Sequence, residues 1–265
     1  MEKINIPVAL TIAGSDCSGG AGIQADLKTF LDHRVHGVSA ISCIVAETPL
    51  EVRQIEEVGA ATFDAQLNIL SESYPISAAK AGLLPSASSI GSVAKTIEQS
   101  GIPLVVDPVM IASTGTNLVG DNTLHSMTNT LLPVATLVTP NLPEAEAILQ
   151  RSIISEADHI NAAHDIAQRY DISCLLKGGH LAGKGERLDV LWHDGQAHHF
   201  RHPYLSLPDS VHGTGCSLSA AVTAGLAHDQ NMIEAVNHAI DYTQKLMRSA
   251  YKWGHNNHNI RCLGW

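Results

Sequence analysis

Short apolar runs alternate with amphipathic stretches along most of the chain. Six runs have the length and apolar character of buried strands: 8–13, 38–46, a short run ending near Gly82, 104–106, 136–138 and 174–176. Three stretches carry apolar residues at helical spacing: 22–31, 62–71 and 89–99. Strands that are apolar throughout and separated by helices are typical of a parallel sheet covered on both faces. The pattern therefore predicts a three-layer α/β/α sandwich.

The pattern changes in the last third of the chain. Residues 188–192 and 197–200 flank a His193-Asp194-Gly195 turn, which predicts a late antiparallel hairpin beside the mostly parallel sheet. Residues 214–251 have the character of two helices separated near 229–231. No linker, repeat or low-complexity segment interrupts the chain, so we expect residues 1–265 to form a single domain.

Charge and composition exclude several classes of function. The 16 basic residues against 26 acidic ones give a net charge of −10, which argues against binding to a nucleic-acid backbone. Five cysteines without a CxxC pair indicate a reducing compartment rather than a disulfide framework. The N-terminus lacks the features of a signal peptide, and no apolar run approaches the ~18 residues of a membrane span. The 15 histidines include no zinc-binding spacing. We expect a cytoplasmic protein that binds neither nucleic acid nor membrane.

Polar residues and glycines follow the predicted strands directly. Five such segments are Gly14-Ser15-Asp16, Glu47, Asp107-Pro108, Asn141 and Lys177-Gly178-Gly179. Functional groups of doubly wound sheets gather outside the carboxyl ends of the strands. We therefore expect these five segments to meet at one edge of the sheet.

The first glycine-rich loop, residues 14–22, has two interpretations. It is not a P-loop, because no Lys-Ser/Thr pair follows its glycines. Gly20, Gly22 and Ala25 match the dinucleotide pattern GxGxxG/A, which would indicate an NAD(P)-dependent oxidoreductase. The six residues between Ala13 and Gly20 count against a dinucleotide. A tight turn with close helix packing explains the same glycines.

The second glycine-rich loop, residues 210–221, directly precedes a helix of small residues. Backbone N–H groups at such a helix start can hold an anion or stabilise charge on a transferred phosphoryl group. An ordinary helix entry with Thr214 as cap is the alternative. Cys216 falls in the first turn, where we expect the helix dipole to lower its pKa; a buried inert thiol is the alternative.

Two further segments are ambiguous by themselves. Asn141 and Glu144 have the spacing of a helix cap, and the same residues at a sheet end suit magnesium and nucleotide phosphates. Lys177 can be a cation beside a nucleotide or a solvated lysine at a strand end.

Taken together, the motifs resemble one family. They are LTIAGSDCSGGAGIQADLKTF (10–30), VVDPVM (105–110), LVTPNLPEAE (137–146), LLKGGH (175–180) and HGTGCSLSAA (212–221). With them, the chain resembles the ribokinase-like superfamily and, within it, the hydroxymethylpyrimidine/phosphomethylpyrimidine kinases of thiamine biosynthesis. The resemblance spans nearly the whole chain and implies a ribokinase-like form of the sandwich.

The resemblance implies a chemistry and a set of residues. In the family, ATP phosphorylates the hydroxymethyl group of an aminopyrimidine and then the resulting monophosphate. ATP and Mg²⁺ are therefore expected, a monovalent cation is left open, and the family is typically homodimeric. The implied residues are Gly14, Asp26, Val45, Glu47 and Val109 for the pyrimidine; Glu144 and Asp107 for Mg²⁺; Lys177, Asn141 and Thr214 for ATP; and Gly213, Thr214, Gly215 and Cys216 for the anion hole. We hypothesise that Cys216 also helps to accept the hydroxymethyl proton.

Some positions depart from the family pattern and keep alternatives open. They are Glu47-Thr48-Pro49, Leu83 and Ser113. The departures leave the second phosphorylation undecided and admit pyridoxal or pyridoxine as substrate, although Glu47 favours a ring that offers an amino donor. A non-catalytic pyrimidine-binding protein is a further alternative. The sequence also does not decide whether residues 111–117 form a lid.

Overall fold

A nine-stranded sheet forms the centre of the protein. The computed structural model describes residues 6–110, 120–178, 185–205, 212–255 and 258–265. Within them the strand order is β3-β2-β1-β4-β5-β6-β7-β8-β9. The strands are β1 (Val8–Asp16), β2 (His36–Thr48), β3 (Glu51–Glu57), β4 (Ile76–Ala81), β5 (Leu104–Val106), β6 (Leu137–Val138), β7 (Ser173–Leu176), β8 (Glu186–His193) and β9 (Gln196–Pro203). In this spatial order the strands from β2 to β7 run parallel, and β3 and β8 run antiparallel to them. β9 pairs antiparallel with β8 and so runs in the direction of the parallel strands. The predicted sheet and late hairpin are confirmed.

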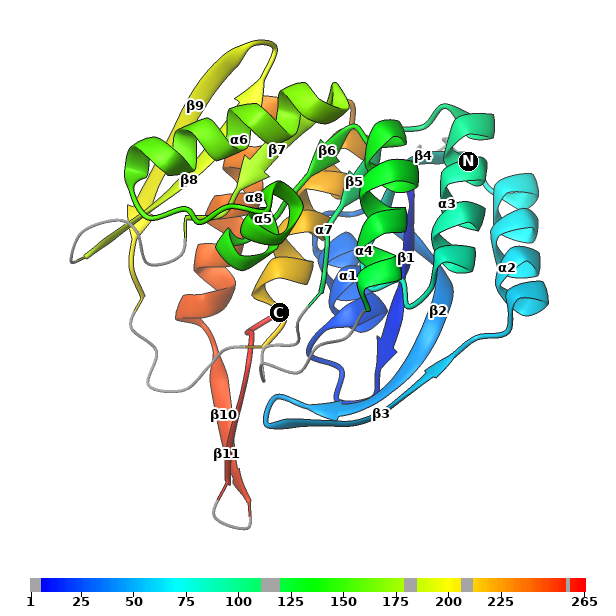
Figure 1. The fold of residues 1–265 in the computed structure, drawn as a ribbon. Helices are drawn as coiled ribbons and strands as arrows, with labels where there is room; N and C mark the ends of the chain where they lie inside the picture. Colours follow the sequence, from blue (N-terminus) through cyan, green and yellow to red (C-terminus); the bar gives the residue numbers. More distant parts are fainter. Residues whose placement is uncertain (1–5, 111–119, 179–184, 206–211, 256–257) are drawn as a thin grey trace.

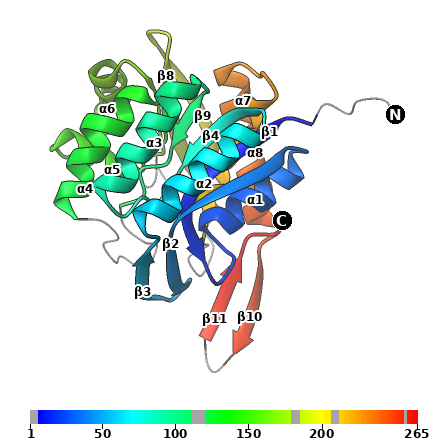
Figure 2. The same cartoon turned by 90° about the vertical axis from the view of Figure 1, so that its right-hand side faces the viewer.

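Helices cover both faces of this sheet (Figures 1 and 2). One face carries α2 (Ala60–Ser73), α3 (Ala87–Ser100), α4 (Asp121–Ser126), η1 (Met127–Leu131), η2 (Leu132–Val134), α5 (Leu142–Leu149) and α6 (Glu156–Tyr170). The other carries α1 (Gly22–Asp32), α7 (Thr214–Ala227) and α8 (Met232–Arg248). Each face has its own buried apolar cluster, as a sandwich requires. No helix within the described residues is long and apolar enough to cross a membrane.

Two structured segments carry no apolar pattern that would predict them. β3 is mostly exposed and polar, and it pairs with β2 only along one edge of the sheet. The last predicted helix ends at Arg248 rather than near Tyr251, and a second hairpin follows it. This hairpin, β10 (Tyr251–His255) and β11 (His258–Cys262), extends away from the sandwich in both views (Figures 1 and 2). Edge strands with one or no buried face do not need an apolar run.

A buried ion pair connects α1 to the middle of the sheet. The Lys80 ammonium of β4 donates to Asp26 Oδ1 at 2.5 Å, and both side chains are 0% exposed. The hydroxyl of Thr11, on β1, donates to the other carboxylate oxygen. Burial by itself lowers the pKa of Lys80, but the charges of Asp26 and other nearby groups and the hydrogen bond to Asp26 together outweigh burial and raise that pKa. The ammonium therefore stays charged, and each member of the pair needs the other.

We expect Lys80→Met to lower the free energy of unfolding by about 3–5 kcal/mol, because it leaves the Asp26 carboxylate buried without its cation. The double variant Lys80→Met/Asp26→Leu should lose clearly less than the single variant, since it removes both charges. Urea unfolding of the wild type, both single variants and the double variant measures this coupling. A Lys80→Met variant as stable as the wild type would contradict the pairing.

Candidate active site

A cavity of about 210 Å³ opens at the carboxyl ends of the parallel strands. Twelve of the thirteen predicted site residues line it: Gly14, Val45, Glu47, Asp107, Val109, Asn141, Glu144, Lys177, Gly213, Thr214, Gly215 and Cys216. Segments that lie up to about two hundred residues apart in the chain therefore meet at one sheet edge, as expected from their positions after strands. Ser113 and residues 111–117 lie outside the described part of the chain.

Asp26 is the predicted residue that does not line this cavity. It is fully buried and bonded to Lys80, and Lys80 is the member of the pair that reaches the cavity wall. Sequence reasoning missed Lys80 because it stands inside an apolar strand, where the only signal was a lysine at a position expected to be buried. His212, Leu83 and Gly82 also belong to the wall and were not predicted as site residues.

The loop at Gly213–Cys216, the predicted anion hole, is held by a close contact between Gly213 and Gly20. Gly213 is the N-cap of α7, with a φ of +84° and no capping side chain, so the alternative with Thr214 as cap is wrong. A Cβ on Gly213 would lie 1.8 Å from the carbonyl oxygen of Gly20. A Cβ on Gly22 would likewise lie 2.3 Å from the carbonyl oxygen of Gly14. Close backbone packing therefore explains these glycines without a dinucleotide.

Asp16, the last residue of β1, is the centre of a hydrogen-bond network. Its Oδ2 accepts from the backbone N–H groups of Gly20 and Ala21 at 3.0 and 2.8 Å, and from the Ser18 hydroxyl at 2.9 Å. The same oxygen lies 3.0 Å from His212 Nε2, which donates to it. Burial raises the pKa of Asp16, but these donors outweigh burial and lower it to about 2. Asp16 is therefore a carboxylate whose acceptor sites are filled.

Glu47 lies beside this network. Ligand atoms of Asp16, Glu47 and His212 fall within 4.8 Å of one another, a grouping that sequence analysis did not predict. The Asp16 oxygen already accepts four hydrogen bonds, so a cation would have to displace some of them. Burial, together with the charge of Asp16, raises the pKa of Glu47. Within the described residues, Asp16 and His212 are therefore joined by a hydrogen bond, and the Glu47 carboxyl group lies beside them in the cavity wall.

Three further ionisable side chains, those of Lys177, Asp107 and Glu144, belong to the cavity wall. Lys177 Nζ donates to Asp107 Oδ1 at 3.1 Å. Burial raises the pKa of Asp107, but Lys177 and Lys80 outweigh it and lower that pKa, so Asp107 is ionised. Burial raises the pKa of Glu144 to about 7, and the charge of Asp107 adds to this rise, while Lys177 opposes it. The predicted cap is also present, because Asn141 Oδ1 accepts from Glu144 N–H and Glu144 Oε2 from Asn141 N–H.

Cys216 differs from the sequence-based expectation. We predicted a pKa lowered by the helix dipole, and that prediction is wrong. Burial raises the pKa of the thiol to about 12, and although Lys80 opposes the rise, the charges of Asp107 and Asp26 add to it. Desolvation and nearby carboxylates thus outweigh the dipole of the first helical turn. The residue is a protonated thiol at neutral pH.

A second cavity, of about 570 Å³, adjoins the first. It lies between α7, α8 and the β8 strand, and its wall includes the cation Arg187 as well as apolar side chains such as Leu218 and Ile240. Four residues belong to both cavities: Asn141, Lys177, Thr214 and Gly215. A Cβ on Gly215 would lie 3.4 Å from Lys177 Nζ and 3.6 Å from Asp107 Oδ2, so this shared residue lies directly beside the Lys177–Asp107 ion pair.

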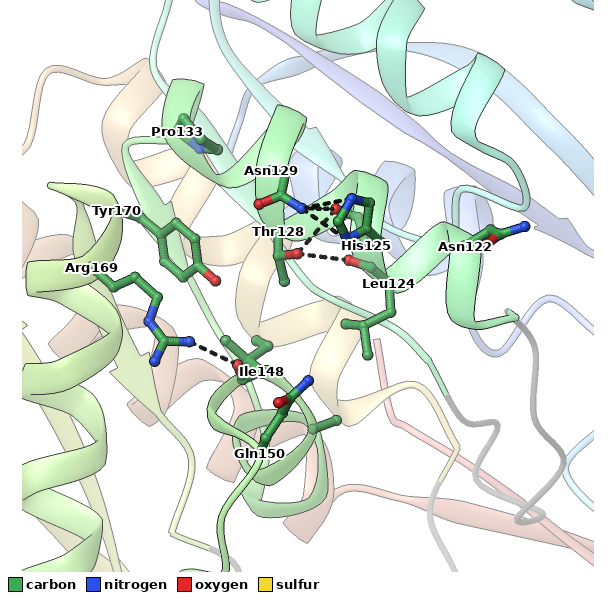
Figure 3. A pocket seen from close by; sticks show the side chains of 11 residues that line it. Asn122, Leu124, His125, Thr128, Asn129, Pro133, Ile148, Gln150, Arg169 and Tyr170 are labelled. Atoms are coloured by element: carbon green, nitrogen blue, oxygen red, sulfur yellow. Dashed lines mark hydrogen bonds between the residues drawn. The ribbon is translucent and has the colours of Figure 1, made fainter.

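A third and larger cavity, of about 890 Å³, lies elsewhere, between α4, η1, α5 and α6 (Figure 3). Its polar side chains are used locally: Asn129 pairs with His125, and Arg169 donates to the carbonyl of Ile148. None of the predicted site residues lines it. Volume by itself therefore does not identify the site, whereas the convergence of charged groups and glycine loops does.

The chain matches the model of the phosphomethylpyrimidine kinase family over residues 16–261. It is 38% identical over 249 residues to the hydroxymethylpyrimidine/phosphomethylpyrimidine kinase of Synechococcus elongatus, a match that covers 94% of each chain. It is 35% identical to the enzyme of the same name from Bacillus subtilis, covering 93% of this chain and 91% of the other.

Solved structures show the same relationship. The phosphomethylpyrimidine kinase of Clostridium difficile superposes with a TM-score of 0.80 at 34% identity, covering 91% of this chain and 99% of the other. Bacillus subtilis pyridoxal kinase in complex with ADP gives a TM-score of 0.88 at 31% identity, covering 98% of each chain. The ribokinase-like fold is therefore confirmed. By its sequence, its fold and the motifs that meet at its cavity, the chain belongs to the phosphomethylpyrimidine kinase family.

Proposed function

We propose that the protein transfers the γ-phosphoryl group of ATP to the hydroxymethyl group of 4-amino-5-hydroxymethyl-2-methylpyrimidine, and then phosphorylates the monophosphate to the diphosphate in thiamine biosynthesis. Relatives that carry the corresponding name match more than nine-tenths of the chain. As one ribokinase-like domain, residues 1–265 would act in the cytoplasm. A homodimer is proposed from the family resemblance.

One observation carries this proposal: two cavities meet at Asn141, Lys177, Thr214 and Gly215. Phosphoryl transfer requires an acceptor and a nucleotide on either side of a site that stabilises the moving phosphoryl group. The smaller cavity, with Glu47 and Val45, suits the pyrimidine ring. Its larger neighbour suits the nucleotide, and solved pyridoxal kinases of the same fold have been seen with ADP.

Glu47 would select the ring. A carboxylate accepts hydrogen bonds and the exocyclic amino group of an aminopyrimidine donates them, so the two groups are complementary. Gly14 belongs to the same wall, where a Cβ would lie 3.0 Å from Cys43 Sγ and 3.4 Å from the side chains of Leu83 and Val45, so a larger residue would crowd this wall. Val45, Val109 and Leu83 supply apolar wall around the same space.

Asp107 and Glu144 fit a magnesium ion. Both carboxyl groups line the cavity, and oxygen atoms are the ligands that Mg²⁺ prefers. With both carboxylates ionised, Lys177 balances only one of the two charges, which is consistent with the pKa of about 7 at Glu144. Mg²⁺ held there would neutralise charge on the phosphates of ATP.

The chain's own residues would orient the reaction. Lys177, kept protonated beside Asp107, would bind phosphate oxygens, and the N–H groups at the start of α7 would stabilise charge on the transferred group. Because Cys216 is a protonated thiol, it would not act as a ready thiolate. To accept the hydroxymethyl proton, Cys216 would first have to release its own proton to solvent, which the nearby Lys80 ammonium favours. The resulting thiolate would then take the hydroxymethyl proton as the phosphoryl group arrives, in a reaction that depends on positioning more than on a strong base.

A vitamin B6 kinase is the second candidate, because pyridoxal kinases superpose on the chain with TM-scores of 0.87–0.88. A coupled assay of ADP release with ATP and Mg²⁺ separates the candidates. We expect turnover of both hydroxymethylpyrimidine and its monophosphate, and a much lower kcat/KM for pyridoxal. Turnover of pyridoxal alone would assign the protein to B6 salvage. No turnover of any of the three by the folded protein would contradict the role of Glu47.

Cys216→Ala should lower kcat by about 10²-fold or more, because a positioned proton acceptor contributes 10²–10⁴-fold. The KM for the pyrimidine should change much less, since the ring is held by other residues. Steady-state kinetics with saturating ATP measures both constants. Full kcat in the variant would remove the proton-accepting role, although the anion hole could still function.

Glu144→Gln should make stability less dependent on pH. The pKa of Glu144 is raised, so between its unfolded value of about 4.5 and about 7 the folded protein holds the extra proton. Stability from this group therefore falls as pH rises through that window, by on the order of 3 kcal/mol. We expect urea unfolding to show this decline in the wild type relative to Glu144→Gln.

The same two proteins test the magnesium site. Above pH 7, Mg²⁺ should raise the Tm of the wild type, because the ion would bind the ionised pair in the folded state. Glu144→Gln should respond clearly less. Equal thermal shifts in the two proteins would place the ion elsewhere.

A further inference from the structure

His212 is a buried residue of the cavity wall that the proposed reaction does not use directly. It immediately precedes Gly213, the N-cap of the anion-hole helix α7. Its Nε2 donates to Asp16 Oδ2 at 3.0 Å across 196 residues of sequence. This bond joins Asp16, at the end of β1 in the first glycine-rich loop (residues 14–22, here called the pyrimidine loop), to the loop that would hold the phosphoryl group.

The geometry on both sides of the bond is fixed. Asp16 is itself held by the backbone N–H groups of Gly20 and Ala21, so its acceptor oxygen cannot turn away without breaking those bonds. The His212 ring lies against Gly20, where a Cβ would be only 2.7 Å from His212 Cδ2. One residue further on, Gly213 packs on the carbonyl oxygen of the same Gly20.

These contacts indicate that the imidazole of His212 restrains the loop at the start of α7. An anion hole is effective when its N–H groups are fixed in advance at the place where charge develops. Gly213 has no capping side chain, and within the helix the N–H and the hydroxyl of Ser217 hold its carbonyl oxygen. A further restraint comes from outside the helix, through the Asp16–His212 bond and the packing on Gly20.

We infer that His212 and Asp16 are positioning residues that fix the anion-hole loop Gly213–Cys216 against the pyrimidine loop. Neither residue needs to touch the transferred group. The low pKa of Asp16, about 2, is consistent with an acceptor that stays ionised over the working pH range. The inference rests on the proposed function for its effect on kcat, but not for its effect on the loop itself.

Three variants test the inference. His212→Ala removes the donor. His212→Gln replaces it with an amide nitrogen that can occupy the place of Nε2. Gly20→Ala keeps the imidazole but adds a Cβ that must displace the ring of His212. Because Gly20 does not have a positive φ, alanine fits its backbone conformation. Ser18→Ala is the matched control, because Ser18 also donates to Asp16 Oδ2 but does so from the turn after β1 and lies outside the cavity wall.

The kinetic readout separates positioning from substrate binding. We expect kcat to fall about 10²-fold in His212→Ala and Gly20→Ala, because small displacements of catalytic groups cost that much. The KM for the pyrimidine should change by less than about threefold, and kcat of His212→Gln should recover to within about tenfold of the wild type. The control should keep its kcat. A His212→Gln variant as slow as His212→Ala would overturn the inference.

Amide hydrogen exchange gives a readout that does not depend on turnover. We expect faster exchange of the amides at 213–217 in His212→Ala and Gly20→Ala, with wild-type exchange in His212→Gln and in the control. Unchanged exchange in the first two variants would overturn the inference even if the enzyme is active. If the wild type turns over no pyrimidine but the amides at 213–217 still exchange faster in His212→Ala and Gly20→Ala, the proposed function fails and the positioning role stands. Should His212→Ala not fold, Gly20→Ala decides the result in the same two measurements.

Discussion

The carboxylate of Asp16 is the point on which the arrangement of the site depends. It ends β1, a strand in the middle of the sheet, and it gathers the N–H groups of the turn that leads into α1. The same oxygen accepts from His212, at the entrance to α7. Two helices on one face of the sheet therefore begin from a single anionic acceptor. Because a buried carboxylate must have its acceptor sites filled, the loops around it have little freedom to rearrange.

Several ionisable side chains of the site are buried, and two of the carboxylates are balanced by a lysine of the same chain. Lys80 balances Asp26 beneath the cavity, and Lys177 balances Asp107 at its wall. Burial raises the pKa of Glu144 because Lys177 offsets it only in part, whereas Lys177 and Lys80 together lower the pKa of Asp107. In the proposed function, Lys177 would be the fixed cation for phosphate, and Asp107 and Glu144 would be oxygen ligands whose charge a divalent ion balances.

Much of this arrangement could be predicted from the sequence, because apolar strands and the polar residues that end them follow simple rules. A parallel strand order is enough to place Glu47, Asp107, Asn141 and Lys177 at one edge of the sheet. The same rules could not find β3, whose exposed polar residues lack periodic burial. The family pattern also assigned Asp26 to the pocket, because a sequence does not show which member of a buried pair faces the ligand. The pKa of Cys216 depends on burial and on Asp107 and Asp26, neither of which is close to it in sequence.

The similarity to two kinds of vitamin kinase shows which part of the molecule must carry substrate selectivity. Pyridoxal kinases superpose on the chain at least as well as a phosphomethylpyrimidine kinase does, so the scaffold is common to both. Selectivity must then lie in the few side chains around the ring. In the proposed function, Glu47 is the one whose hydrogen-bonding character would distinguish an amino group from an acceptor. Burial raises the pKa of Glu47, and the charge of Asp16 adds to this rise while His212 opposes it, so the distinction would depend on the Asp16–His212 pair. The bond that we infer to position the anion-hole loop would therefore also set the electrostatic environment in which the ring is recognised.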